Sequence, residues 1–178
     1  NNFFKGSLVM LIGSNFYNLG QFIYHFLTGR LLGKALYGDL AAIISIITYF
    51  GIIQLALGLT IVKFIAQQKN KNNIFNFVKW FNLWGLVLAG CLALLSLALS
   101  PLIANFLNIN SKISIYILPI FIFFFSIVYI HRSILQGMLK FENLALSYIL
   151  EIILKIVLTS IFIVLGWAVF GAVIALIM

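Results

Sequence analysis

The chain has 178 residues, of which 64% are hydrophobic and only 8% are charged, and its mean hydropathy is +1.19. About a quarter of the residues in soluble globular proteins are charged, so this composition excludes a water-soluble domain. The net charge of +8 arises from 11 Lys and Arg against 3 Asp and Glu. We predict one all-α domain over residues 1–178, a polytopic transmembrane helix bundle.

Charged residues are absent from blocks of the chain that are long enough to cross a bilayer. A helix of 24 residues, the length of the uncharged block 6–29, is about 36 Å long, and the hydrocarbon core is about 30 Å thick. We predict about five complete spans and the start of a sixth, near residues 6–28, 40–62, 81–105, 113–131, 144–165 and, truncated, 168–178. Pro119 lacks a backbone donor and predicts a kink within the fourth span.

The chain starts at Asn1 without an initiator Met and ends at Met178 within an apolar run, so we expect an N-terminal fragment of a longer protein. Its orientation follows from the distribution of Lys and Arg between the connections, which are richer in these residues on the cytoplasmic side. One side would hold Lys5, Lys63, Lys69, Lys71, Lys79, Arg132 and Lys140, and the other side Arg30, Lys34 and Lys112. We therefore predict a cell-membrane protein with a cytoplasmic N-terminus.

Polar residues follow one face of the first predicted span. They are spaced three or four residues apart and stay within an arc of about 80° at 100° per residue: Ser14, Asn18, Gln21, His25 and Thr28. Polar groups in the membrane are costly, so this face should meet either a water-filled cavity or another helix. Both interpretations remain open.

Two other spans carry patterns of their own. The third span has small residues on one face, which favours close packing against a neighbouring helix: Asn82, Gly85, Ala89, Ala93, Ser96, Ser100 and Ala104. In the fifth span Glu151 precedes Lys155 by four residues, the favourable order for an ion pair on a helix. These two residues form either a structural pair or a substrate or ion site.

Sequence motifs for enzymatic chemistry are missing. The three carboxylates, Asp39, Glu142 and Glu151, are too few and too scattered for an acid/base pair or a metal site, and there is no Gly-rich phosphate loop. Cys91 is the only cysteine. We therefore expect no catalytic residues, no metal, no cofactor and no enzyme activity.

Two stretches resemble motifs of a transporter family. Residues 29–39, Gly-Arg-Leu-Leu-Gly-Lys-Ala-Leu-Tyr-Gly-Asp, are similar to the R-x-L-G-x-x-x-Y-G signature that follows the first span of polysaccharide-biosynthesis flippases. Residues 132–141, Arg-Ser-Ile-Leu-Gln-Gly-Met-Leu-Lys-Phe, resemble R-x-x-L-Q-G-x-x-x-F, and Gly166 to Ala172 resembles the G-x-x-x-x-G-A that opens the sixth span. Lys34-Ala35 stands where Pro-Glu is common, and Lys63 and Lys155 stand where Arg is often expected. The chain thus resembles the lipid-linked oligosaccharide flippases of the O-antigen type, within the multidrug/oligosaccharidyl-lipid/polysaccharide exporter superfamily.

The resemblance implies a fold of two pseudo-symmetric lobes around a central cavity, of which this chain would be the first. The implied function is translocation of a polyprenyl-diphosphate-linked oligosaccharide by alternating access, with the lipid bilayer and the second lobe of the full-length chain as partners and no nucleic acid. Candidate diphosphate contacts are Arg30, Lys63 and Lys155; candidate sugar or water contacts are Asn18, Gln21 and His25; Glu151 would restrain Lys155 or take part in ion coupling. A drug/cation antiporter of the same superfamily and a non-transporting membrane subunit remain as alternatives.

Overall fold

A computed structural model describes residues 2–68, 71–107 and 112–177, and every regular element in these ranges is a helix. The elements are α1 (Asn2–Gln67), α2 (Lys71–Leu107), α3 (Lys112–Tyr116), α4 (Leu118–Gly137), α5 (Phe141–Val164) and α6 (Ala168–Ile177). Four helical stretches are long and apolar enough to cross a membrane. The prediction of an all-α, multi-pass membrane protein is therefore confirmed. Residues 69–70 and 108–111, which belong to two of the predicted connections, lie outside the described part.

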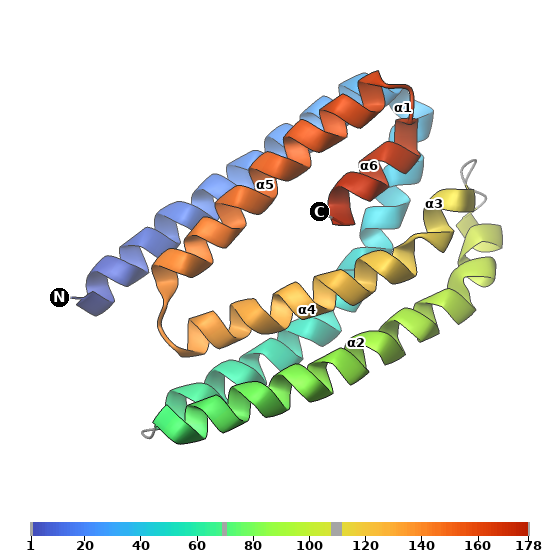
Figure 1. Cartoon of the computed structure of the whole chain (residues 1–178). Helices are drawn as coiled ribbons and strands as arrows, with labels where there is room; N and C mark the ends of the chain where they lie inside the picture. Colours follow the sequence, from blue (N-terminus) through green and yellow to red (C-terminus); the bar gives the residue numbers. More distant parts are fainter. Residues whose placement is uncertain (1, 69–70, 108–111, 178) are drawn as a thin grey trace.

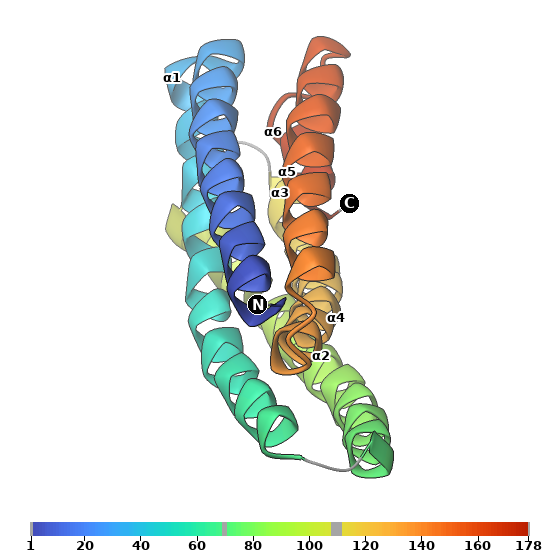
Figure 2. The ribbon, with the colours of Figure 1, turned by 90° about the vertical axis from the view of Figure 1, so that its left-hand side faces the viewer.

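Helix α1 contains two of the predicted spans. The backbone is helical through the predicted connection 29–39 except at Gly33, where φ is 73° and ψ is 174°. Glycine adopts a positive φ without the steric strain that a Cβ would add. The parts on either side of Gly33 are each about 45–50 Å long at the rise of an α-helix. Figures 1 and 2 show the chain turning back at this kink, so one residue replaces the loop that we predicted.

The helices form two groups, each built around one half of α1. Helix α5 packs along the first half, and α4 packs along the second half and against α2 (Figures 1 and 2). Helix α2 in turn contacts the last turns of α1, where Phe64 stacks with Phe77. Helix α6 lies between the groups, where Val169 and Val173 share a buried apolar cluster with Leu40 of α1. Within the second group, the buried Gln54 side chain donates a hydrogen bond to Ser126 of α4.

Glycines bring the helices of each group into close contact. A Cβ at Gly20 would lie 2.3 Å from Cγ1 of Ile152 in α5, and one at Gly13 would lie 2.7 Å from the Cβ of Ala145. Small residues permit such approach between membrane helices, where no hydrophobic force draws helices together. The same holds for α2, where Ala89 and Ala104 are buried and a Cβ at Gly85 would meet Ile130 of α4 at 2.5 Å. The packing interpretation of the small-residue face is confirmed.

The fourth predicted span differs from the helix that forms. Helix α4 is separated from the short α3 by Ile117 and has Pro119 in its first turn, where no backbone donor is needed. The predicted span 113–131 is thus interrupted at Ile117, two residues before Pro119, in agreement with the disturbance expected from this proline. At its other end α4 continues to Gly137, so the predicted connection 132–143 shrinks to three residues and Arg132 belongs to the helix.

The helix ends gather at the two ends of the bundle. The N-terminus, the last turn of α1, the first turn of α2 and the α4–α5 connection lie at one end (Figure 1). The kink at Gly33, the last turn of α2 and the α5–α6 connection lie at the other end. This alternation is the up-and-down arrangement that successive membrane crossings require.

Candidate functional site

A cavity of about 740 Å³ lies between the two groups of helices. One side is formed by the first half of α1 and by α5, the other by the second half of α1 and by α4, and Ala175 and Leu176 of α6 also contact it. Pockets for small molecules and cofactors typically measure about 300–1,000 Å³. Its polar side chains include Tyr17 and Gln21, which lie near the middle of the first half of α1 and hence at membrane depth.

An ion pair crosses the cavity from α4 to α5. Nη1 of Arg132 lies 2.5 Å from Oε2 of Glu151. The guanidinium also donates from Nε to Oγ of Ser147 at 3.1 Å and from Nη2 to its backbone carbonyl at 3.0 Å, and it lies over the ring of Tyr148, 4.3 Å from the centroid. The other carboxylate oxygen of Glu151 accepts a hydrogen bond from the Tyr17 hydroxyl at 3.0 Å. Glu151 therefore connects α1, α4 and α5.

Lys155 has a different environment. Its Nζ donates to Oε1 of Gln21 at 3.1 Å and lies over the ring of Tyr24, 4.1 Å from the centroid. Glu151, four residues earlier, forms its ion pair with Arg132, and no ion pair joins it to Lys155. The interpretation of Glu151 and Lys155 as an ion pair is therefore wrong, because the partner of Glu151 is Arg132. With two cations and one carboxylate among its described lining residues, the cavity has a formal excess charge of +1 if His25 is neutral.

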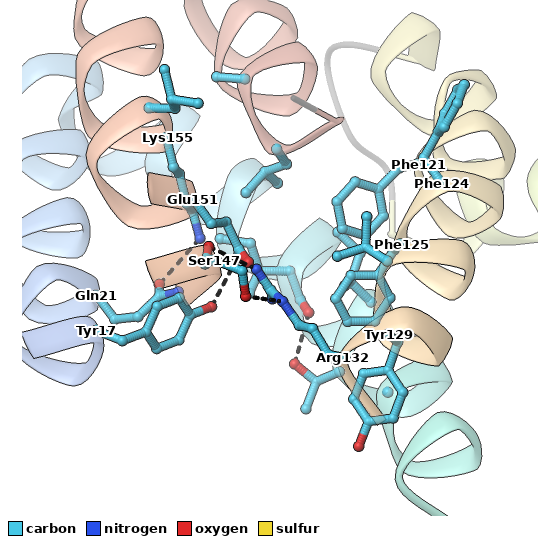
Figure 3. Close-up of a pocket in the computed structure, with 18 of the residues that line it drawn as sticks. Tyr17, Gln21, Phe121, Phe124, Phe125, Tyr129, Arg132, Ser147, Glu151 and Lys155 are labelled. Carbon is cyan, nitrogen blue, oxygen red and sulfur yellow. Dashed lines mark hydrogen bonds and ion pairs between the residues drawn. The ribbon is translucent and has the colours of Figure 1, made fainter. Parts of the chain in front are cut away.

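The wall opposite this polar cluster is aromatic. Phe121, Phe125 and Tyr129 are spaced four residues apart on α4, so they lie on one face, with ring centroids separated by 5.3 Å and 6.2 Å. Phe124 also lines the cavity. Figure 3 shows the aromatic rings on one side and Tyr17, Gln21, Glu151 and Lys155 on the other, with Arg132 extending between them. The cavity is thus amphipathic.

The sequence matches the family of polysaccharide biosynthesis proteins over residues 3–178. The chain belongs to this family. The match confirms the resemblance drawn from the short motifs, which lie in α1, across the α4–α5 connection, and from the α5–α6 connection into α6. Comparison with curated proteins and with solved structures gives no significant match.

In this polysaccharide biosynthesis protein, the cavity includes only part of the predicted residue set. Gln21, His25, Glu151 and Lys155 line it. Asn18, Arg30 and Lys63 are exposed and lie outside its lining. Nδ1 of His25 shares a hydrogen bond with the Tyr37 hydroxyl at 3.2 Å.

Only part of the polar face of the first span meets the cavity or another helix: Gln21 lines the cavity and accepts a hydrogen bond from Lys155 of α5. The central residues of this face, Gln21 and His25, line the cavity, whereas Ser14 and Thr28 bond to carbonyls of the preceding turn of their own helix. Thr28 is buried, with a bond of 2.7 Å to the carbonyl of Tyr24. The cavity interpretation therefore holds for Gln21 and His25 and does not apply to Ser14, Asn18 or Thr28.

Sequence reasoning missed Arg132 and Tyr17 as residues of the cavity. The charge of Arg132 places it in a connection when spans are defined by uncharged blocks, whereas the helix extends beyond Arg132 to Gly137. A carboxylate within a membrane needs a cation nearby, which was the available signal. In the described residues, no group of three or more His, Cys, Asp or Glu side chains is arranged to hold a metal ion.

Proposed function

We propose that this chain is one lobe of a flippase that moves a polyprenyl-diphosphate-linked oligosaccharide from the cytoplasmic to the outer leaflet by alternating access. The observation that carries the proposal is the cationic, amphipathic cavity at membrane depth, in which the ammonium group of Lys155 contacts an amide and an aromatic ring. A cation in such a place calls for a functional explanation. Membership of the polysaccharide biosynthesis family supports a glycan substrate.

The lining residues suit the parts of such a substrate. Lys155 is a point charge with three donors and suits one phosphate oxygen at a time. Gln21 offers both donor and acceptor groups to sugar hydroxyls, and His25 offers one ring nitrogen beyond its bond with Tyr37. The hydrocarbon tail would remain in the bilayer while the polar head crosses the cavity.

Arg132 would add its charge to the site when Glu151 releases it. The diphosphate competes with Glu151 for the same guanidinium, which binds phosphate and carboxylate through similar paired hydrogen bonds. Protonation of Glu151 would weaken the ion pair in the same way. This is the basis for proposing Glu151 as the ion-coupling residue.

Two alternative functions fit these residues less well. A drug/cation antiporter needs acidic groups facing its substrate, but Glu151 is the one carboxylate among the described lining residues and it is already paired with Arg132. A non-transporting subunit would bury its polar residues between helices, whereas several of them here border a cavity of about 740 Å³.

We propose a cytoplasmic N-terminus and a location in the cell membrane, with the bilayer and the second lobe as partners. Because Arg132 lies in the cavity, the count of Lys and Arg in the connections becomes six on the N-terminal side against three, still in the same direction. In a Cys91→Ala background, Lys34→Cys should react with an impermeant maleimide on intact cells, and Lys140→Cys should react only after lysis. The reverse pattern would invert this topology.

The substrate proposal is tested by Lys155→Ala in cells that carry the full-length gene. Export of surface polysaccharide should fall at unchanged protein level, with lipid-linked precursor accumulating in the cytoplasmic leaflet, because a phosphate contact is lost. Lys34→Ala is the matched control, since Lys34 is exposed and lies outside the cavity. Lys155→Arg should retain part of the export. Full export by Lys155→Ala would refute the assigned role.

A further inference from the structure

Tyr24 contacts Lys155 from outside the cavity. Its side chain is 1% exposed and lies between α1 and α5, and it is not among the residues that line the cavity. The contact follows from the close approach of the two helices at Gly20, where a Cβ would meet Ile152. Tyr24 lies one turn after Gly20 on the same face of α1. Lys155 lies three residues after Ile152 on α5, and its Nζ is 4.1 Å from the centroid of the Tyr24 ring.

The ring of Tyr24 attracts the ammonium group of Lys155 and leaves its charge intact. The face of an aromatic ring is negative and attracts a cation, most strongly where water is excluded. Because the ring has no net charge, it stabilises the cation without neutralising it. Arg132 differs, since the carboxylate of Glu151 neutralises its charge. A phosphate in the cavity therefore meets a free charge at Lys155 and a compensated charge at Arg132.

Lys155 has an alternative partner within reach on its own helix. Glu151 lies one turn earlier on α5, at the spacing that favours an ion pair, and both residues line the cavity. A lysine that turned toward this carboxylate would share it with Arg132 and lose its free charge. Oε1 of Gln21, 3.1 Å from Nζ, and the ring of Tyr24 hold the ammonium group on the α1 side. Figure 3 shows Lys155 extending to Gln21, while Glu151 meets Arg132.

We propose that Tyr24 is a positioning residue that holds the ammonium group of Lys155 toward a phosphate in the cavity and away from Glu151. The inference rests on the proposed function, in which Lys155 contacts the diphosphate of the substrate. Without the attraction of the ring, part of the population would pair Lys155 with Glu151. The apparent affinity for a diphosphate would then fall with the fraction of molecules in which Lys155 remains available.

The test changes the electrostatics of the ring and keeps its shape. Tyr24→Phe is the reference, because within the described residues the Tyr24 hydroxyl has no hydrogen-bond partner to lose. Tyr24→trifluorophenylalanine has nearly the same shape, but its fluorine atoms withdraw negative charge from the ring face. Binding of farnesyl diphosphate to the full-length protein in phosphatidylcholine nanodiscs is measured by isothermal titration calorimetry. Fluorination should weaken binding about three- to thirtyfold relative to Tyr24→Phe, the range of a cation–π contact.

Two further backgrounds show whether Tyr24 acts through Lys155. Fluorination at position 24 should have no effect in Lys155→Met, where the ammonium group is gone. Its effect should be smaller in Glu151→Gln, where the competing carboxylate is gone. The matched control is Phe26→trifluorophenylalanine, because the Phe26 ring lies 5.9 Å from Cζ of Arg30, a cation outside the cavity, and binding should not change.

The outcomes separate this inference from the proposed function. If Lys155→Met does not weaken binding of farnesyl diphosphate, the proposed phosphate contact is refuted, and the positioning role with it. If Lys155→Met weakens binding but fluorination of Tyr24→Phe does not, the positioning role alone is refuted. An equal effect of fluorination in Lys155→Met would mean that Tyr24 acts through packing, and an undiminished effect in Glu151→Gln would mean that no competition with this carboxylate exists. Either result would overturn the inference.

Discussion

The ion pair between Arg132 and Glu151 predicts a specific pattern of stability changes. Glu151→Gln removes the negative charge and keeps an oxygen that accepts from Tyr17, so the loss is confined to the charge. Arg132→Met removes the positive charge from the other side. Each single variant leaves one charge at membrane depth without its partner, and the double variant leaves neither. The two effects should therefore be strongly non-additive.

The size of this coupling follows from the burial of the pair. Breaking a fully buried pair costs about 3–5 kcal/mol, and an exposed pair contributes less than about 1 kcal/mol. Here the Arg132 side chain is 12% exposed and that of Glu151 is 30% exposed, so the pair lies between these limits. We expect a coupling free energy of about 2 kcal/mol. For Glu151 and Lys155, four residues apart on one helix and without a direct ion pair, about 0.5 kcal/mol is expected.

Two double-mutant cycles measure these values by equilibrium unfolding of the purified protein in mixed micelles. The first combines Glu151→Gln with Arg132→Met, and the second combines Glu151→Gln with Lys155→Met. The second cycle is the matched comparison, because it contains the same carboxylate and a different cation. If the Lys155 cycle gives the larger coupling, or if the Arg132 cycle is additive within about 0.5 kcal/mol, the assigned pairing is refuted.

Two further predictions concern glycines. Gly20→Ala should lower the free energy of unfolding by about 1–3 kcal/mol, because its Cβ would lie 2.3 Å from Ile152. Gly90→Ala is the control, since a Cβ at Gly90 has no neighbouring atom within 4 Å. Equal stability of the two variants would contradict the close packing of α1 and α5. Gly33→Ala should destabilise the protein by about 1 kcal/mol or more through its positive φ alone, since there is open space around it. Gly38→Ala, in helical backbone with equal space, should not be destabilising, and the same loss in both would argue against the kink.

The class of the protein and one of its packing surfaces could be predicted from the sequence, because they depend on periodicity within one helix. Uncharged blocks of bilayer length identified the spans, and the small residues around Ala89 identified the face of α2 that meets α4. Gln21, His25 and Lys155, which line the cavity, could also be predicted as candidate site residues, because a polar side chain at membrane depth needs a cavity or a partner. None of these inferences required knowledge of which helix lies opposite.

The partner of each charged group was decided by the tertiary structure. Glu151 and Lys155 lie on one side of α5, and their spacing favoured a pair, but spacing along one helix carries no information about the register of its neighbours. The extension of α4 to Gly137 brings Arg132 to Glu151, and the approach of α1 to α5 at Gly20 brings Gln21 to Lys155. The sequence by itself thus determined that charges would lie within the membrane. Packing between helices decided that one is paired and that the other contacts neutral groups at the cavity, because ion pairs form over a few ångströms between segments distant in the chain.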